Sequence, residues 1–119
     1  MTVMWARLEA DVNVNLRRGA WYRVLRLSAR EAVLEVNREP LPVERSYLRF
    51  ANHPPRAWTV VPAPQHSSRF PISWGESYAV CPSCRERAPL LEGHPTGQRC
   101  QRCNGYFTID WDEAYLRTA

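Results

Sequence analysis

Apolar residues occupy every second position over thirteen residues near the start of the chain, from Met4 to Leu16. The positions between them, from Arg7 to Asn15, hold charged or amide side chains. A period of two indicates a β-strand with one buried and one solvent-exposed face. Because the pattern is longer than most strands, we expect the strand to bend or to carry a bulge.

Four more short segments have the composition of strands, and they cover residues 21–27, 32–36, 41–43 and 57–61. Gly19, residues 28–31 and residues 37–40 supply the turns between the first of them. Residues 46–50 fit a single helical or 3₁₀ turn. Five short strands and one helical turn within about sixty residues predict a small, half-open β-barrel.

The spacing Leu16-x-x-Gly19-x-x-Tyr22-x-Val24 is followed by a hairpin, by Pro42-Val43 and by a turn that holds Leu48. This pattern resembles the small SH3-like barrels of the KOW and Tudor type over roughly residues 2–61. The resemblance implies a first domain at residues 1–61, with the strand at 57–61 as its last. The alternative is another small meander sheet packed on the C-terminal module.

Residues 62–69 (PAPQHSSR) are rich in proline and serine and show no periodicity, which is typical of a linker. Phe70, Ile72, Trp74, Tyr78 and Val80 then recur at even positions. We therefore expect residues 62–77 to form a linker or a docking strand, and residues 78–119 to form a second domain.

All four cysteines stand in two Cys-x-x-Cys pairs, Cys81 with Cys84 and Cys100 with Cys103. Two such turns at this separation can close a tetrahedral cage of thiolates around one zinc ion. Four sulfurs fill every coordination position, so the predicted zinc is structural and has no open position for a substrate water. The alternatives are an iron ion in a rubredoxin-like site and a redox-active dithiol.

Residues 78–111 resemble the zinc-ribbon superfamily. Pro82 stands after the first ligand, Asn104-Gly105 follows the second pair, and Phe107, Ile109 and Trp111 alternate like a strand beneath the site. Arg85 departs from the family pattern, because many ribbons have glycine after the first pair. The sequence therefore predicts an all-β protein, a small SH3-like barrel followed by a C-terminal four-cysteine zinc ribbon.

No nucleophile–histidine pair, glycine-rich phosphate loop or carboxylate pair is apparent, so we expect no enzyme activity. His94 lies between the cysteine pairs and is expected to be a solvated loop residue. The N-terminus shows no secretory signal and no apolar run is long enough for a membrane span, so we expect a cytoplasmic protein.

The net charge is +4 and every basic residue apart from histidine is arginine, which genome composition or phosphate recognition would explain. Residues 1–61 hold ten arginines and six acids, whereas residues 62–119 hold six of each. The candidate contacts for nucleic acid or another partner combine arginine with one aromatic residue. They are Arg17, Arg18, Trp21, Arg23, Arg26, Arg85 and Arg102.

Two functions fit these features. In the first, the protein binds nucleic acid, RNA or DNA, or a machine of transcription or translation, through phosphate contacts and aromatic stacking. In the second, it is an adaptor or accessory subunit that meets another protein. Five tryptophans favour the second function, because tryptophan and arginine are enriched at interface hot spots; they are Trp5, Trp21, Trp58, Trp74 and Trp111.

Overall fold

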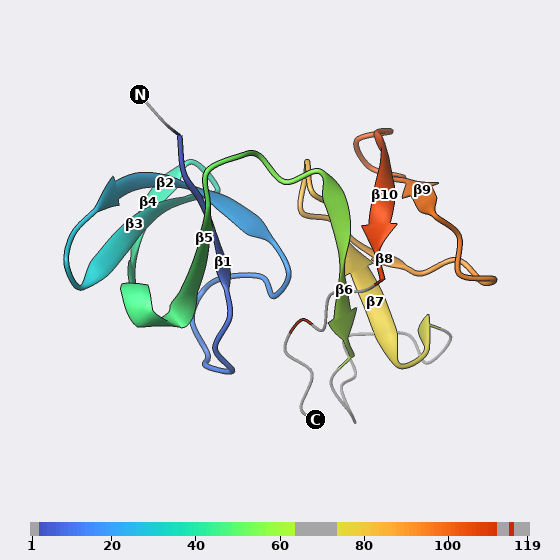
Figure 1. Ribbon diagram of the computed structural model, residues 1–119, viewed down its shortest axis with the longest axis horizontal. Coiled ribbons are helices and arrows are strands. Elements are labelled where there is room, and N and C mark those ends of the chain that lie inside the picture. The colour runs from blue at the N-terminus through green and yellow to red at the C-terminus, as the bar shows by residue number, and fades with distance from the viewer. Residues whose placement is uncertain (1–2, 64–73, 112–114, 116–119) are drawn as a thin grey trace. The chain divides into compact units, whose positions relative to one another are not determined.

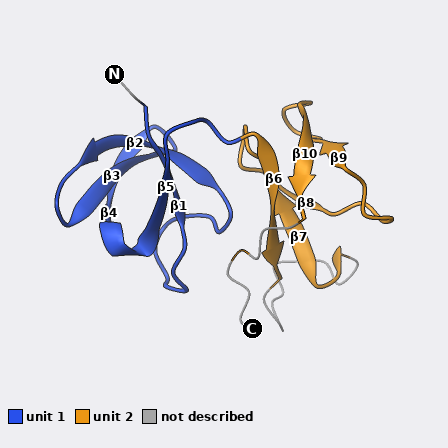
Figure 2. Cartoon of the chain, in the orientation of Figure 1, with its two compact units in different colours: residues 1–55 blue, residues 56–119 orange. Residues whose placement is uncertain are grey.

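The computed structural model describes residues 3–63, 74–111 and 115. The chain is all-β and forms two five-stranded sheets (Figure 1). It divides into two compact units, Met1–Pro55 and Arg56–Ala119 (Figure 2). These observations confirm the predicted all-β class, with a small half-barrel followed by a cysteine module. Among the described residues, no helix is long and apolar enough to cross a membrane.

The first unit is an antiparallel sheet of five strands that curls into a half-barrel (Figure 1). Its strands follow the order β4-β3-β2-β1-β5, and a 3₁₀ turn, η1, links β4 to β5. The elements are β1 (Trp5–Leu8), β2 (Trp21–Leu27), β3 (Glu31–Val36), β4 (Glu39–Glu44), η1 (Arg45–Tyr47) and β5 (Leu48–Ala51). The register of β2 against β3 shifts between Val24 and Arg26, which marks a bulge.

The core of the half-barrel comes from alternate positions on β1, β2, β3 and β4, as a period of two requires. The buried side chains of these strands include Ala6, Leu8, Tyr22, Ala32, Leu34 and Val43. The long alternating segment that starts at Met4 contributes a strand only over β1, which corrects the prediction of one strand reaching Leu16. After Leu8 the chain turns, and the backbone N–H of Arg17 donates to the Tyr22 hydroxyl at 2.9 Å.

The helical turn predicted at residues 46–50 is shorter than expected and lies at Arg45–Tyr47. Residues Leu48–Ala51 form β5, which pairs with β1 over four residues. The first sheet therefore obtains its fifth strand from this segment. Periodicity alone missed the strand, because four residues are too few to display a clear alternation.

The strand predicted at residues 57–61 exists as β6 (Ala57–Pro62), but the structure corrects its assignment to the half-barrel. It pairs in parallel with β10 (Tyr106–Asp110) and antiparallel with β7 (Ser77–Val80), both in the second unit. Pro62 stands opposite Ser77, and the N–H of Ala63 donates to the carbonyl of Glu76 at 2.8 Å. The segment predicted as a linker thus joins two neighbouring strands of one sheet.

Residues 64–73 lie outside the described part, and with them the predicted strand positions Phe70 and Ile72.

The second sheet has the order β8-β7-β6-β10-β9, where β8 is Arg87–Pro89 and β9 is Gly97–Arg99. Its buried core contains two of the four cysteines. The core residues are Trp58, Val60, Ala79, Cys81, Cys100 and Ile109.

Candidate metal centre

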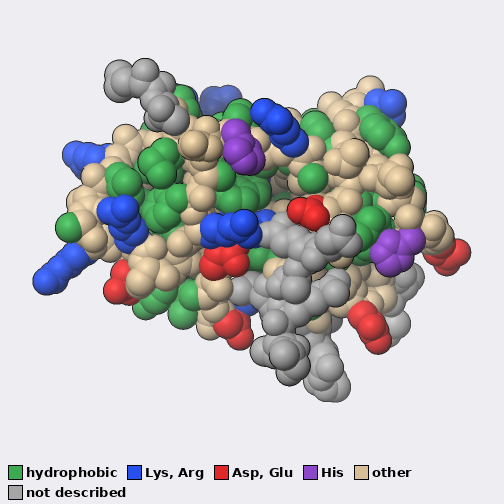
Figure 3. Space-filling view, in the orientation of Figure 1, with side chains coloured by type: hydrophobic (Ala, Val, Ile, Leu, Met, Phe, Trp, Pro, Cys, Tyr) green, Lys and Arg blue, Asp and Glu red, His purple; other side chains and the backbone are tan. Residues whose placement is uncertain are grey.

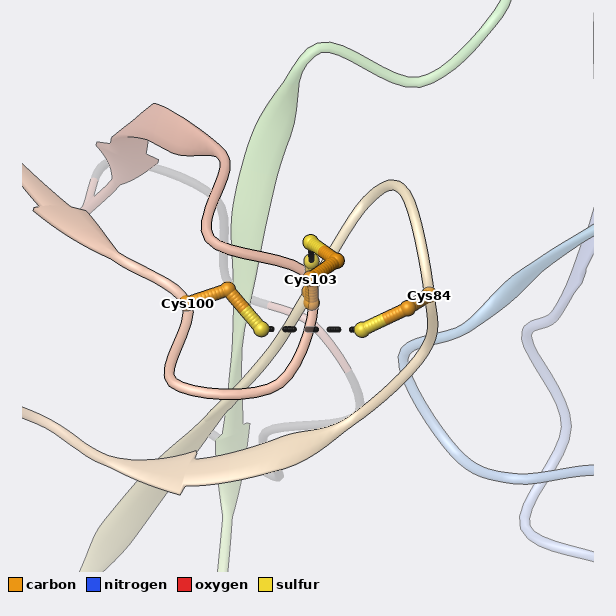
Figure 4. Close-up of side chains that lie close together, drawn as sticks. Cys84, Cys100 and Cys103 are labelled. Carbon is orange, nitrogen blue, oxygen red and sulfur yellow. Dashed lines mark hydrogen bonds between the residues drawn. The ribbon is translucent and has the colours of Figure 1, made fainter.

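The four cysteine sulfurs converge on one point in the second unit. All four Sγ atoms lie within 4.8 Å of one another, and none of the cysteines forms a disulfide. The sulfurs of Cys84 and Cys100 point toward each other at 3.5 Å (Figure 4). Those of Cys81 and Cys103 are 3.7 Å apart. Sulfurs bound to one tetrahedral zinc at about 2.3 Å would be about 3.8 Å apart. The observed spacing therefore fits a single metal ion bound by all four sulfurs.

Each Cys-x-x-Cys pair lies on a turn of the same geometry. In the first, the N–H of Cys81 donates to the carbonyl of Glu86 at 2.9 Å, and the N–H of Arg85 donates to the carbonyl of Cys81 at 3.1 Å. In the second, Cys100 and Gly105 pair at 2.8 Å, and Asn104 donates to Cys100 at 2.9 Å. The same hydrogen bonds at the same offsets produce two equivalent turns.

The departure from the zinc-ribbon pattern at Arg85 has a backbone consequence. Arg85 and Asn104 occupy the same position in the two turns, and both have a φ of 64°. Asparagine tolerates this left-handed conformation more readily than arginine does, because its short polar side chain can bond locally. The first turn therefore holds a strained residue where the second holds a favourable one.

Gly105 is required by packing. A Cβ atom there would lie 2.7 Å from two carbons of the Phe107 ring. Phe107 packs against the core beneath the cysteines. The second turn therefore packs directly against the hydrophobic core, and a side chain at Gly105 would displace the Phe107 ring.

Two tryptophans anchor the loop that joins the two cysteine pairs. The indole N–H of Trp58, which is fully buried, donates to the carbonyl of Gln98 at 3.0 Å. The indole N–H of Trp111 donates to the carbonyl of Pro95 at 2.7 Å. Because Gln98 is only two residues from Cys100, the Trp58 bond helps to hold the second cysteine pair in place.

The protonation of the thiols depends on where each sulfur lies. Burial raises the pKa of Cys81 to about 12 and also raises the pKa of Cys84. A hydrogen bond from the backbone N–H of Gly105 lowers the pKa of Cys103, which is exposed, to about 7. Four neighbouring thiolates need a cation to stay deprotonated together, so metal binding here must release protons.

The donor set decides which kind of metal the centre could hold. Four soft sulfurs in a tetrahedral arrangement suit zinc or iron and do not suit magnesium or calcium. His94 is not part of the ligand group within the described residues. It is exposed, and its ring centroid lies 3.7 Å from that of Trp111.

The candidate partner-binding residues are divided between the two units. In the half-barrel, Trp5 stands opposite Arg23, and Arg7 stands opposite Trp21. Residues two apart on a strand share a face, so these four side chains lie on the face opposite the Ala6–Tyr22 core pair. Arg26 is exposed at the bulge, and Arg17 and Arg18 lie in the loop before β2. In the second unit, Arg85 and Arg102 lie in the two cysteine turns.

Arg7 lies on this face but was not among the contact residues predicted from the sequence. Its guanidinium lies 4.7 Å from the centroid of the Trp21 ring, and its Nη2 bonds the Glu9 carboxylate at 2.7 Å. Arg7 is buried to 1% exposure, so it supports Trp21 and is not itself accessible. The alternation on β1 predicts that Arg7 faces away from Ala6 and Leu8, but only the pairing with β2 reveals its partner.

Two of the predicted side chains already have acidic partners. Arg18 forms an ion pair with Asp11 at 2.6 Å, and Arg102 lies 3.7 Å from Glu86. Both pairs are at the surface, where such contacts contribute little to stability. They reduce the positive charge that these arginines offer to a ligand.

None of the five tryptophans is fully exposed. Trp58 is completely buried, and Trp5, Trp21, Trp74 and Trp111 are half-buried. The large apolar side chains that are exposed in the described residues are Val3, Leu25, Leu27, Leu91 and Tyr106. Trp58 therefore belongs to the core, whereas Trp5 and Trp21 remain partly accessible on the face opposite the Ala6–Tyr22 pair.

No family model, curated protein or solved structure matches this chain.

Proposed function

We propose that the protein is a non-enzymatic, zinc-binding accessory factor that contacts nucleic acid, or a machine that processes it, through its half-barrel. The zinc ion is structural and is bound by Cys81, Cys84, Cys100 and Cys103. The observation that supports a zinc site is the convergence of the four sulfurs within 4.8 Å, on two turns with the same backbone hydrogen bonds. The chain's resemblance to zinc ribbons and KOW-like barrels, which recur in transcription and translation factors, adds an argument by analogy.

Metal analysis tests the first part of this proposal. Protein purified without added metal is expected to contain about one zinc per chain, and a Cys84→Ser/Cys103→Ser variant is expected to contain almost none. Iron in place of zinc would give a coloured protein with an absorption spectrum in the visible range. Full occupancy of the double variant would mean that these cysteines are not the ligands.

The arrangement of side chains on one sheet face is the main support for nucleic-acid binding by the half-barrel. In the register of β1 and β2, Arg23 lies beside Trp5. The Trp21–Arg7 pair is next to them on the same face. Arg23 and Arg26 are exposed, and no ion pair involving either is found among the described residues. Most of the arginine side chains visible in Figure 3 lie over the first unit. Guanidinium groups next to aromatic rings suit phosphate contacts combined with base stacking.

A matched pair of double variants tests this interface. Arg23→Gln/Arg26→Gln removes two charges from the proposed face, and Arg30→Gln/Arg38→Gln removes two exposed charges from hairpin turns of the same unit. We expect the first variant to weaken binding to a labelled single-stranded oligonucleotide by roughly tenfold or more. Its log–log salt slope should fall by about two, whereas the control should change little. Equal losses in both variants would indicate unspecific attraction.

A protein–protein adaptor is the second candidate, and Leu25 favours it. This residue stands at the β2 bulge between Arg23 and Arg26 and is 49% exposed. An apolar side chain flanked by two arginines is also suited to a protein interface. Nuclease-treated co-purification separates the two functions, because one defined protein partner that persists without nucleic acid, at high salt, would favour the adaptor.

A further inference from the structure

Tyr106 is the most exposed large apolar side chain among the described residues, at 58%. It begins β10 and stands directly opposite Arg99 on β9, at the edge of the second sheet. The core-facing residues of β10, Phe107 and Ile109, point the other way. The tyrosine therefore belongs to the outer face of the β9–β10 hairpin and takes no part in the core that carries the cysteines.

The end of the tyrosine ring lies close to a glycine of the same hairpin, Gly97. A Cβ atom at Gly97 would lie 2.9 Å from the Tyr106 hydroxyl oxygen and 3.0 Å from a ring carbon. The same Cβ atom would lie 2.8 Å from the backbone oxygen of Phe107, so a side chain at this position would meet both the neighbouring strand and the ring. The hydroxyl end of the ring therefore lies next to Gly97, and more than half of the residue remains exposed to solvent.

Arg99 is positioned beside the same ring. Its Nη1 donates to the carbonyl of Asn104 at 2.8 Å, and its guanidinium carbon lies 5.9 Å from the Tyr106 centroid. Arg102 is exposed in the adjoining cysteine turn, with a side chain that is 63% accessible. Glu86 lies 3.7 Å from Arg102, and Asp110 is further along β10 on the same face. Arg99 and Arg102 thus bring two guanidinium groups to the tyrosine end of the hairpin, of which that of Arg102 is shared with Glu86.

We propose that Tyr106 and Arg99 form a second nucleic-acid contact, in which an unpaired base stacks on the tyrosine ring and Arg99 and Arg102 contact the neighbouring phosphates. This inference rests on the proposed function, since it assigns that function a contact outside the half-barrel. A ring that already lies against its own hairpin loses less conformational entropy when a base stacks on it than a freely rotating side chain would. Stacking on an aromatic ring tolerates every base, so the site selects unpaired strands without selecting their sequence.

A structural role for the ring is the competing explanation, because an aromatic side chain that covers a glycine also stabilises a strand pair. Three substitutions separate the two roles. Tyr106→Phe retains the ring, Tyr106→Leu retains apolar cover over Gly97 without an aromatic face, and Tyr106→Ala removes both. The assay measures binding of the full chain to fluorescein-labelled twelve-nucleotide oligo(dT) and oligo(U), with zinc content as the check on folding.

If the proposal is right, Tyr106→Phe binds within about twofold of the unmodified protein, and Tyr106→Leu loses roughly five- to tenfold while keeping its zinc. Arg99→Gln weakens binding and lowers the salt slope by about one. Comparison of the two oligonucleotides shows whether RNA or DNA is preferred.

Equal binding by the Phe and Leu variants, both with full zinc, would overturn the stacking proposal while leaving the half-barrel interface intact. No binding of either oligonucleotide by the unmodified protein would instead overturn direct nucleic-acid contact by the half-barrel as well as by the hairpin. A Tyr106-dependent interaction with one protein, and none with either oligonucleotide, would assign the hairpin to a protein interface.

Discussion

The core of the half-barrel consists of aliphatic, small and aromatic side chains from four strands. The core of the second unit also includes two of the clustered cysteines, Cys81 and Cys100. The strands differ in the same way. β2, β3 and β4 have six or seven residues each, but β8 and β9 have three. Three-residue strands make few ladder bonds and bury little apolar surface.

The comparison shows two ways of stabilising a unit of about sixty residues. At that size a hydrophobic core is only marginally sufficient, and a structural metal is a common supplement. The half-barrel is stabilised by regular strand pairing, in which β1 pairs with both β2 and β5. In the second unit the loops that carry the cysteines replace regular structure, and a metal ion bound by the four sulfurs would connect them. The two units should therefore respond differently to the same treatments.

Metal removal should have the largest effect and should act on one unit. Chelation, or Cys100→Ser, is expected to unfold the second unit, because the free energy of metal binding is a large part of its folding free energy. Amide chemical shifts from the half-barrel, such as those of Ala32 and Leu34, should stay dispersed. A cooperative loss of both sets of signals would show that the half-barrel does not fold by itself.

A core substitution in the half-barrel should have the converse effect. Leu34 is fully buried on β3, so Leu34→Ala is expected to destabilise this unit by about 2–5 kcal/mol through lost burial and a cavity. Hydrogen exchange measured unit by unit should show faster exchange in β1 to β5 and unchanged exchange around the cysteines. Zinc content serves as the control and should stay at about one per chain.

The smallest effect concerns the two cysteine turns. Arg85→Asn should be more stable than Arg85→Ala by up to about 1 kcal/mol, because asparagine accepts the left-handed backbone that alanine resists. Both substitutions remove the arginine side chain, so their difference isolates the backbone. Competition with a chelator measures it as a difference in the zinc dissociation constant. Equal values for the two variants would mean that the positive φ at this position carries no cost.

Local pattern was sufficient to predict that the four cysteines cluster. Each Cys-x-x-Cys pair makes its turn within six residues, through hydrogen bonds such as that from Cys81 to Glu86. The ligand set, the turn at Asn104 and the strand at Phe107 and Ile109 all follow from such short-range patterns. The departure at Arg85 was also visible in the sequence, although its backbone conformation was not.

Pairing between distant segments was decided only in the folded chain. The sequence of residues 57–61 predicts a strand, and a strand forms there, but nothing local states which sheet it joins. Its partners, β7 and β10, come later in the chain, and β10 lies more than forty residues away. The Trp21–Arg7 and Tyr106–Gly97 contacts depend on register in the same way. The sequence by itself therefore determined the two cysteine turns and most of the strands, because these depend on neighbouring residues. Only the tertiary structure decided which strands share a sheet and which side chains share a face, because backbone hydrogen bonds between strands are the same for every residue type.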